Sequence, residues 1–458
     1  MKAISLLRER SAVNTVIFII PLVIISRAFP LFTFVYYLLP VLFLLVFIQG
    51  YEFIFKDRNL RSLLLLFLVF GLWSAVTSFW SDYPLITLMR AAYFVFISFG
   101  AVLAGYSWSK ANPNSLALSL PANVVIIILS LFSLITNIPA DSWTGGHGKG
   151  FMGFSGHQNT LASAILFTLP GLMWQNGKRQ PVSPRRAEAG MANGRGLRGI
   201  SNLKSQISNL SIWFLLLMDI LILILSYSRG SILSLVCGVV FFLFITKRWK
   251  ILIYSFSLVL LFVCLVFISP ALKKETVKLI EKDFPAFYSS REWLWVPSYK
   301  AALNGGLTGL GYGMSDPEIK ADVPGSHYEG ERYIREKGNS VLALIEEVGI
   351  VGLVLFIVPL VYLFHNYKDT SDRQPITNNQ QPITNNQHPA SEIKNPSSII
   401  RQPSSILIAS LAAFIVHSLF EAWWVGVGST ELPLFFLYIG CVIKPIITND
   451  NATEGSVV

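Results

Sequence analysis

Long apolar runs recur throughout the sequence, and they constrain the fold more than any other feature. Each run is roughly 17–25 residues long, the length of helix that crosses a hydrocarbon core of ~30 Å. A lone signal anchor would account for only one of them. The composition agrees, because 53% of the residues are hydrophobic and only 14% are charged, too few charges for an ordinary soluble surface. We therefore predict an all-α polytopic membrane protein.

The apolar runs predict about twelve transmembrane helices. The largest connection between them lies after the ninth span and before the tenth. The predicted spans are Val13–Phe29, Leu31–Gly50, Leu63–Trp80, Leu85–Ala104, Leu116–Ile138, Thr160–Trp174, Ile212–Ser226, Ile232–Thr246, Ile251–Ile268, Val341–Phe364, Ile406–Phe420 and Leu432–Ile447.

Positive charges set the predicted orientation, because cytoplasmic loops carry an excess of Lys and Arg. If the N-terminus is cytoplasmic, the even-numbered connections are cytoplasmic too, and they hold the most basic clusters. These clusters are Lys56, Arg58 and Arg61; Lys178, Arg179, Arg185, Arg186, Arg195, Arg198 and Lys204; and Lys247, Arg248 and Lys250. Both termini are then expected in the cytoplasm. Since these connections account for much of the net charge of +10, we predict no nucleic-acid partner.

This topology divides the chain into four segments. Residues 1–268 hold the first nine spans, 269–338 form a large outer loop, 339–447 hold the last three spans, and 448–458 form a cytoplasmic tail. Two cytoplasmic connections, 175–211 and 368–405, are polar or repetitive, and the second contains QPITNNQ twice in tandem. We expect both to be disordered and to carry no chemistry.

Arginines near the predicted outer boundary are the first candidates for chemistry. Arg229 lies between spans seven and eight, Arg291 lies in the large loop, and Arg90 lies a turn or two into span four. An arginine at the depth of Arg229 needs a partner or a role, whereas a single arginine in a loop, such as Arg291, is weak evidence alone. A guanidinium group offers a planar fork of donors that suits phosphate oxygens. The alternatives are a snorkelling interfacial side chain or a bond to a neighbouring helix.

Acidic residues near the start of span ten are the second group. Glu346 and Glu347 lie about two turns inside the span, and Asn339 shares a helix face with Glu346. A buried acid at that depth is either functional or the partner of an arginine. His417 and Glu421, one turn apart at the end of span eleven, allow the same two interpretations. The cysteines lie inside apolar spans without metal-ligand spacing, so we predict no metal site. No cofactor is expected either.

Five sequence segments occur in an order that resembles the superfamily of O-antigen ligases and O-antigen polymerases, which are bacterial membrane glycosyltransferases. The resemblance covers most of the chain, and the order of the segments around one large outer loop is its strongest part. The segments are WSDYPLITLMR at 80–90, GHQNTLA at 156–162, SRGS at 228–231, SREWLW with a GLTGLGYG tail at 290–313, and GNSVLALIEEVGIVGLVLF at 338–356.

The resemblance implies a metal-independent transfer of glycan from an undecaprenyl diphosphate carrier to an acceptor hydroxyl on the outer face of the bacterial inner membrane. Arg229 and Arg291 match the two outer arginines of the family, which bind the diphosphate and stabilise the leaving group; Arg90 would be a third cation. The partners are then a lipid-linked oligosaccharide, a glycan or lipid-core acceptor, and membrane lipids. Supporting roles fall to residues within the motifs, namely Asn159, Trp293, Gly309, Gly311 and Asn339.

One departure from the family pattern concerns the general base. Ligases of this family typically place His immediately before the Asn-Ser pair, where this chain has Gly338. Candidate bases for the acceptor hydroxyl are therefore His327, Glu336, Glu346 and Glu347. The missing His favours a polymerase, which joins repeat units on the lipid carrier, over a ligase that attaches glycan to a lipid core.

Two other classes of protein fit the same topology. A polysaccharide flippase or other transporter would also have about twelve spans with buried charges. A transporter has no need of a long outer loop with matched arginines, and the two halves of the chain show no repeat. A non-catalytic scaffold of the cell surface is the remaining alternative, and the order of the motifs argues against it.

Overall fold

The computed structural model describes residues 2–111, 115–138, 144–145, 148–178, 197–274, 289–319, 327–329, 332–372, 403–426 and 428–443. These residues are helical apart from connections and two short antiparallel hairpins. Strands β1 (Thr144–Gly145) and β2 (Gly148–Lys149) form one hairpin, and β3 (His327–Glu329) and β4 (Arg332–Ile334) form the other. The predicted all-α class is confirmed.

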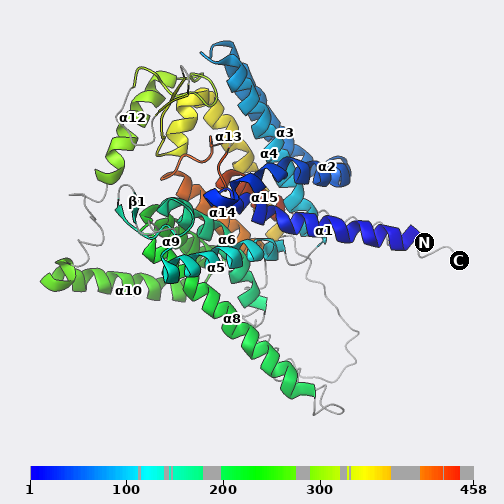
Figure 1. Cartoon of the computed structure of the whole chain (residues 1–458), viewed down its shortest axis with the longest axis vertical. Coiled ribbons are helices and arrows are strands. Elements are labelled where there is room, and N and C mark those ends of the chain that lie inside the picture. Colours follow the sequence, from blue (N-terminus) through cyan, green and yellow to red (C-terminus); the bar gives the residue numbers. More distant parts are fainter. Residues whose placement is uncertain are drawn as a thin grey trace.

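The helices follow one another in the order of Figure 1. The N-terminal half contains α1 (Lys2–Ser26), the 3-10 segment η1 (Pro30–Leu38), α2 (Leu39–Lys56), α3 (Arg58–Val76), η2 (Thr77–Phe79), α4 (Pro84–Ala111), η3 (Ser115–Ser119), α5 (Leu120–Thr136) and α6 (Gln158–Lys178). The remaining helices are α8 (Leu197–Leu225), α9 (Arg229–Ile245), α10 (Trp249–Ile268), α12 (Ser289–Gly305), α13 (Ser340–Asp372), α14 (Pro403–Ser418) and α15 (Glu431–Val442).

Apolar surfaces on these helices identify a multi-pass membrane protein. Among the described residues, six helical segments are long and apolar enough to cross a membrane, and five shorter apolar helices accompany them. Helix α10 projects from the bundle in Figure 1, and none of its apolar window is buried. Such a surface suits lipid and would be unstable in water. Each predicted apolar range overlaps a helix, while the number of about twelve crossings and the outer side of the loop stay predictions.

Three connections contain more helix than the sequence analysis expected. Helix α8 begins at Leu197, inside the segment 175–211, and α13 continues to Asp372, inside the segment 368–405. The large loop 269–338 contains α12 and the β3–β4 hairpin. Of the two segments expected to be disordered, residues 179–196 and 373–402 lie outside the described residues. The two copies of QPITNNQ, at 374–387, fall in the second of these ranges.

The centre of the bundle depends on a close contact between α4 and α15, which lie together in the middle of Figure 1. Gly105 of α4 lies against the backbone carbonyl of Leu437, and Gly440 of α15 lies against the carbonyl of Val102. A Cβ atom at either glycine would collide with backbone. Small residues allow helices to approach closely in a membrane, where packing replaces the hydrophobic effect as the driving force.

A break in α13 joins this bundle to the large loop. Gly349 has φ 73° and ψ −179° in the middle of the helix, a conformation that only glycine adopts readily. The amides of Ile350 and Val351 therefore bond to the carbonyls of Gly306 and Leu307, at 3.1 and 3.2 Å. The loop after α12 thus supplies the acceptors that the helix itself would otherwise provide.

The carbonyl groups freed by the break are bonded by the same loop. Leu310 N donates to Glu346 O, and Gly311 N donates to Glu347 O, both at 2.9 Å. Trp73 of α3 donates its indole N–H to the carbonyl of Val348 at 2.8 Å. Every buried backbone group left unpaired costs free energy, so these bonds fix the loop in the gap of the helix.

Gly309 tests this arrangement, because it has φ 79° and its added Cβ would meet the backbone of Glu347 and Val348. We expect Gly309→Ala to lower the free energy of unfolding by roughly 3 kcal/mol or more. Gly306→Ala is the matched control, since Gly306 also has a positive φ but no atom closer than 3.9 Å to the added Cβ. It should cost about 1 kcal/mol. Thermal unfolding of the two purified variants in detergent measures these changes in the free energy of unfolding. Equal losses in the two variants would contradict the close contact between Gly309 and the backbone of α13.

Candidate functional site

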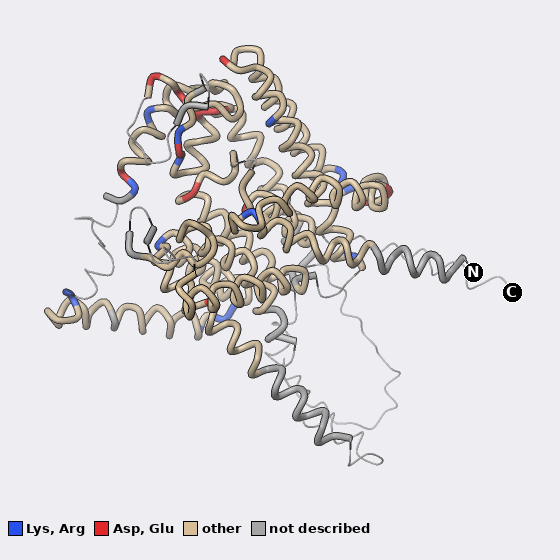
Figure 2. The backbone as a smooth tube through the Cα atoms, in the orientation of Figure 1, with Lys and Arg blue, Asp and Glu red and all other residues tan. Residues whose placement is uncertain are grey.

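Charged residues gather at one end of the structure, around α12 and the first half of α13 (Figure 2). Arg291 lies in the first turn of α12, and its Nη2 donates to Glu421 Oε1 at 2.7 Å. Asn159, in the first turn of α6, donates its Nδ2 to the same oxygen at 2.8 Å. The carboxylate of Glu421 therefore links α6, α12 and the segment after α14.

Residues at the start of α13 hold that segment in place. Asn339 caps the helix, because its Oδ1 accepts from the amides of Val341 and Leu342 at 2.8 and 3.1 Å. Its Nδ2 donates to the carbonyl of Leu419 at 2.9 Å. Ser340 donates its hydroxyl to the carbonyl of Glu421 at 2.7 Å. Asn339, chosen from the sequence as a supporting residue, is thus in contact with the segment that carries Glu421.

Glu421 is ionised at neutral pH. Burial by itself would raise the pKa of this carboxyl group, but the positive charge of Arg291 and the proximity of His417 and His157 outweigh burial and lower the pKa. The charge of Arg291 is consequently paired with a carboxylate, and both side chains keep about a fifth to a quarter of their surface exposed, at 20% and 24%. The ion pair is therefore accessible to a ligand.

Arg229 begins α9 and lies close enough to Arg291 for the two charges to interact. The SRGS segment that contains it packs on α14 through hydroxyl contacts. Ser231 Oγ lies 3.0 Å from Ser228 Oγ and 3.1 Å from His417 Nε2. The indole of Trp423 donates to His417 Nδ1 at 3.2 Å. Because an indole can only donate, His417 is neutral and carries its proton on Nε2, which faces Ser231.

A cavity of about 320 Å³ adjoins the Arg291–Glu421 pair. Polar groups from α4, the large loop, α13 and the segment after α14 line it, together with the ring of Trp423. The charged residues among them are Arg90, Arg335, Glu336, Lys337, Glu347, Glu421 and Glu431. A cavity with convergent charged groups and an aromatic wall is the expected form of a binding site.

Most of these charges are paired within the protein. Arg335 Nη2 donates to Glu346 Oε2 at 2.8 Å, and Lys337 Nζ donates to Glu347 Oε1 at 2.7 Å. The other oxygens of the two acids accept from the amides of Asp316 and Gly313, at 2.9 and 2.6 Å. Both oxygens of Glu346 and of Glu347 are therefore occupied, and the two acids fix the loop to α13.

Glu336 differs from its neighbours, because its side chain is exposed in the cavity while Arg335 and Lys337 are buried. Desolvation by the surrounding protein raises the pKa of the Glu336 carboxyl group, the negative charge of Glu421 raises it further, and Arg291 opposes them. A carboxylate with a raised pKa is a stronger base than an ordinary one.

The other residues chosen from the sequence are placed as follows. Arg90 donates to the carbonyl of Gly313 at 3.2 Å and borders the cavity. Gly309 and Gly311 belong to the loop that is hydrogen-bonded to the break in α13, and Trp293 lies in the first turns of α12. His327 lies in β3, where its backbone pairs with Ile334.

Sequence reasoning did not identify Arg335, Lys337 or Glu431 as part of the site. The run RYIREKG before span ten could have indicated Arg335 and Lys337, because it places four charged residues directly before an apolar helix. The contact of Asn159 and Arg291 with Glu421 had no sequence signal, since the three residues are 130 or more positions apart in sequence.

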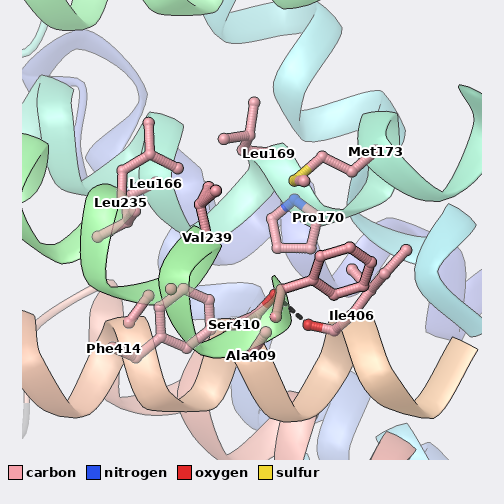
Figure 3. Close-up of a pocket in the computed structure, with 13 residues that line it drawn as sticks. Leu166, Leu169, Pro170, Met173, Leu235, Val239, Ile406, Ala409, Ser410 and Phe414 are labelled. Carbon is pink, nitrogen blue, oxygen red and sulfur yellow. Dashed lines mark hydrogen bonds between the residues drawn. The ribbon is translucent and has the colours of Figure 1, made fainter. Parts of the chain in front are cut away.

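A second, apolar crevice lies between α6, α9 and α14 (Figure 3). It is narrow, about 30 Å³, and its walls include Leu169 and Met173 of α6, Leu235 and Val239 of α9, and Phe414 of α14. Helix α9 therefore begins at Arg229 and lines this crevice farther along its length.

The buried pair of Arg335 and Glu346 yields a stability prediction. Both side chains are fully buried, so that Glu346→Gln would leave the charge of Arg335 without its counter-ion. We expect a loss of ~3–5 kcal/mol in the free energy of unfolding. Glu52→Gln is the control, because Glu52 pairs with Lys56 on an exposed surface, where such pairs contribute little. Detergent-solubilised protein should unfold at a clearly lower temperature only for Glu346→Gln; matching curves would contradict the structural role of the pair.

Comparison with known proteins adds one match. Residues 214–357 match a protein family described as O-antigen ligase. The matched region includes α9, α12 and the broken part of α13, and thus Arg229, Arg291 and Glu336. No curated protein matches the chain significantly.

Proposed function

Because residues 214–357 match the family described as O-antigen ligase, we propose that the protein is a membrane glycosyltransferase that acts on lipid-linked glycans. It transfers a glycan from undecaprenyl diphosphate to an acceptor hydroxyl on the outer face of the bacterial cytoplasmic membrane. The reaction needs no metal. We place it with the polysaccharide polymerases, and a ligase that attaches glycan to a lipid core is the second candidate.

The proximity of Arg229 and Arg291 carries this proposal. The two residues come from α9 and α12, and their charges interact. Glu421, the partner of Arg291, lines the cavity. Two neighbouring positive charges favour the binding of an anion between them. A diphosphate is an anion of the right kind, because each guanidinium group can bind phosphate oxygens through two parallel N–H donors. Arg90 provides a further cation on the cavity wall.

The transfer then requires a base for the acceptor hydroxyl. Glu346 and Glu347 have both oxygens bonded within the protein, which favours Glu336 over them. His327 stays an alternative. As the acceptor oxygen bonds to the anomeric carbon, its proton moves to the Glu336 carboxylate. The bond between the anomeric carbon and the diphosphate oxygen breaks, and Arg229 and Arg291 stabilise the negative charge of the leaving undecaprenyl diphosphate.

Two features of the packing support this assignment. The apolar crevice along α9 offers an isoprenoid chain a surface on the same helix that begins with Arg229. Gly338 explains the missing His of the family pattern, because an added Cβ would lie 2.9 Å from Leu294 Cβ. The carbonyl of Gly338 also accepts from the indole of Trp295 at 3.1 Å. Helix α12 thus occupies the space that a His side chain would need.

Removal of either arginine should abolish most of the transfer. We expect Arg229→Ala and Arg291→Ala each to lower activity by on the order of 10²–10³-fold, the usual effect of deleting one electrostatic donor. The amount of protein in the membrane should stay unchanged. Lys300→Ala is the control, since Lys300 lies on the same helix as Arg291 with its side chain exposed. Wild-type activity in both arginine variants would refute the diphosphate site.

The same variants distinguish the two candidate activities in cells. A gel profile of surface glycan is compared for a deletion strain that carries wild type or Arg291→Ala. Single repeat units without long chains in the variant indicate a polymerase. Full-length chains that remain on the lipid carrier indicate a ligase, and an unchanged profile would exclude both.

The base is tested by Glu336→Gln, for which we expect kcat to fall by roughly 10²–10⁴-fold. Wild-type activity should decline as the pH falls through the raised pKa of Glu336, because the base must be ionised; that decline should be absent from the residual activity of the variant. Glu292→Gln serves as control, since Glu292 is an exposed acid of α12. Activity is measured on purified protein with a lipid-linked donor. A variant with wild-type kcat and an unchanged pH profile would assign the base to another residue.

A further inference from the structure

A buried acid that the proposed reaction does not use lies in the apolar part of α8. Asp219 is 1% exposed and is surrounded by the hydrophobic residues of the predicted seventh span. It forms no ion pair among the described residues. An intramembrane acid without a cation is costly when ionised and points to a function.

The contacts of Asp219 are incomplete in a specific way. Asn123 of α5 donates its Nδ2 to Asp219 Oδ2 at 2.9 Å and to Thr168 Oγ1 of α6 at 3.1 Å. Two oxygens of this cluster are buried and have no hydrogen-bond partner in the described structure: Asp219 Oδ1 and Asn123 Oδ1. They belong to the same two side chains that the 2.9 Å bond already joins.

A single proton would satisfy both oxygens. An ionised Asp219 offers only acceptors, so that Asp219 Oδ1 and Asn123 Oδ1 would both stay unpaired at the cost that a buried polar group carries. A proton on Asp219 Oδ1 turns it into a donor and Asn123 Oδ1 into its acceptor. Acid and amide then form a ring with two hydrogen bonds. The reversed orientation of the amide would also need a proton, because it would set two oxygens against each other.

The helices around Asp219 contain few titratable residues. Helix α8 packs against α5, α6 and α9. Helix α5 contains no titratable side chain, and the only titratable residue of α6 is Lys178 at its end. Helix α9 contributes Arg229 and Cys237, and α8 itself contributes Arg198 and Lys204 in its first turns. Among the described side chains, Asp219 has a hydrogen bond from Asn123 and no ion pair.

We propose that Asp219 and Asn123 form an intramembrane proton-binding site, in which Asp219 is the neutral acid and the acid–amide pair fastens α8 to α5 and α6. Helix α8 ends at Leu225, whose carbonyl accepts from Phe151 N at 2.8 Å, and the chain then turns through Tyr227 at φ 52° into Arg229. The proton thereby holds the helix that leads into the start of α9. Release of the proton at alkaline pH leaves an unpaired charge in the membrane and loosens these helices.

The test uses infrared spectra and thermal unfolding of the full chain in detergent. At neutral pH, wild type should show the carbonyl band of a protonated carboxylic acid that Asp219→Asn lacks. The melting temperature of wild type should fall as the pH rises and this band disappears. The melting temperature of Asp219→Asn should not fall in this way, because its amide donates where the acid O–H did. Asp82→Asn, which changes an exposed acid, should remove no band at neutral pH.

Exchange of the two residues provides a variant that retains the pair. Asn123→Asp combined with Asp219→Asn should keep both the acid band and the alkaline fall in melting temperature, even if a single variant fails to fold. Absence of the band from wild type, or an equal pH dependence of wild type and Asp219→Asn, would overturn the proposal. A melting temperature that rises with sodium in wild type alone would also overturn it, in favour of a metal cation. None of these outcomes depends on glycan transfer, so they are distinct from failure of the proposed function.

Discussion

The break of α13 at Gly349 is the constraint on which the large loop and the candidate site depend. A helix interrupted in an apolar bundle exposes backbone groups that must find partners. Here the partners come from residues 306–311, directly after α12. The break therefore fastens α12 to α13 through backbone bonds, and α12 carries Arg291. The position of the proposed catalytic arginine is thus determined by hydrogen bonds of the main chain and not by side-chain packing alone.

The same break explains why so many charges are buried beside it. Glu346 and Glu347 lie just before Gly349, where they face the loop, and Arg335 and Lys337 neutralise them. These two cations lie on either side of Glu336 in sequence and are buried. All three residues line the cavity, and Glu336 is the exposed one among them. Both oxygens of Glu346 and of Glu347 are bonded, so these acids hold the segment that carries the proposed base in position.

The sequence predicts the helical class well and the site only in part. Apolar runs indicate helices directly, because length and hydropathy are sufficient to span a bilayer. Arg229 is recognisable because an arginine at a predicted membrane boundary needs a reason, and Arg291 is recognisable through the family motif in which it lies. The roles of Glu346 and Glu347 depend instead on where residues 306–316 fold. The pairing of Asp219 could not be predicted from the sequence, because a single acid in an apolar run has no local pattern. Its partner Asn123 is 96 positions away.

The way in which the break of α13 is filled also helps to distinguish a transporter from a transferase. In transporters, discontinuous helices line a cavity, and their free ends bind the substrate or ion. The break at Gly349 is filled by the protein's own loop, and the carbonyls of Glu346, Glu347 and Val348 are all bonded. Movement of this helix would require these bonds to open in an apolar setting. A fixed frame of this kind suits electrostatic catalysis, in which charges are placed before the substrate arrives, and it favours transfer over alternating access.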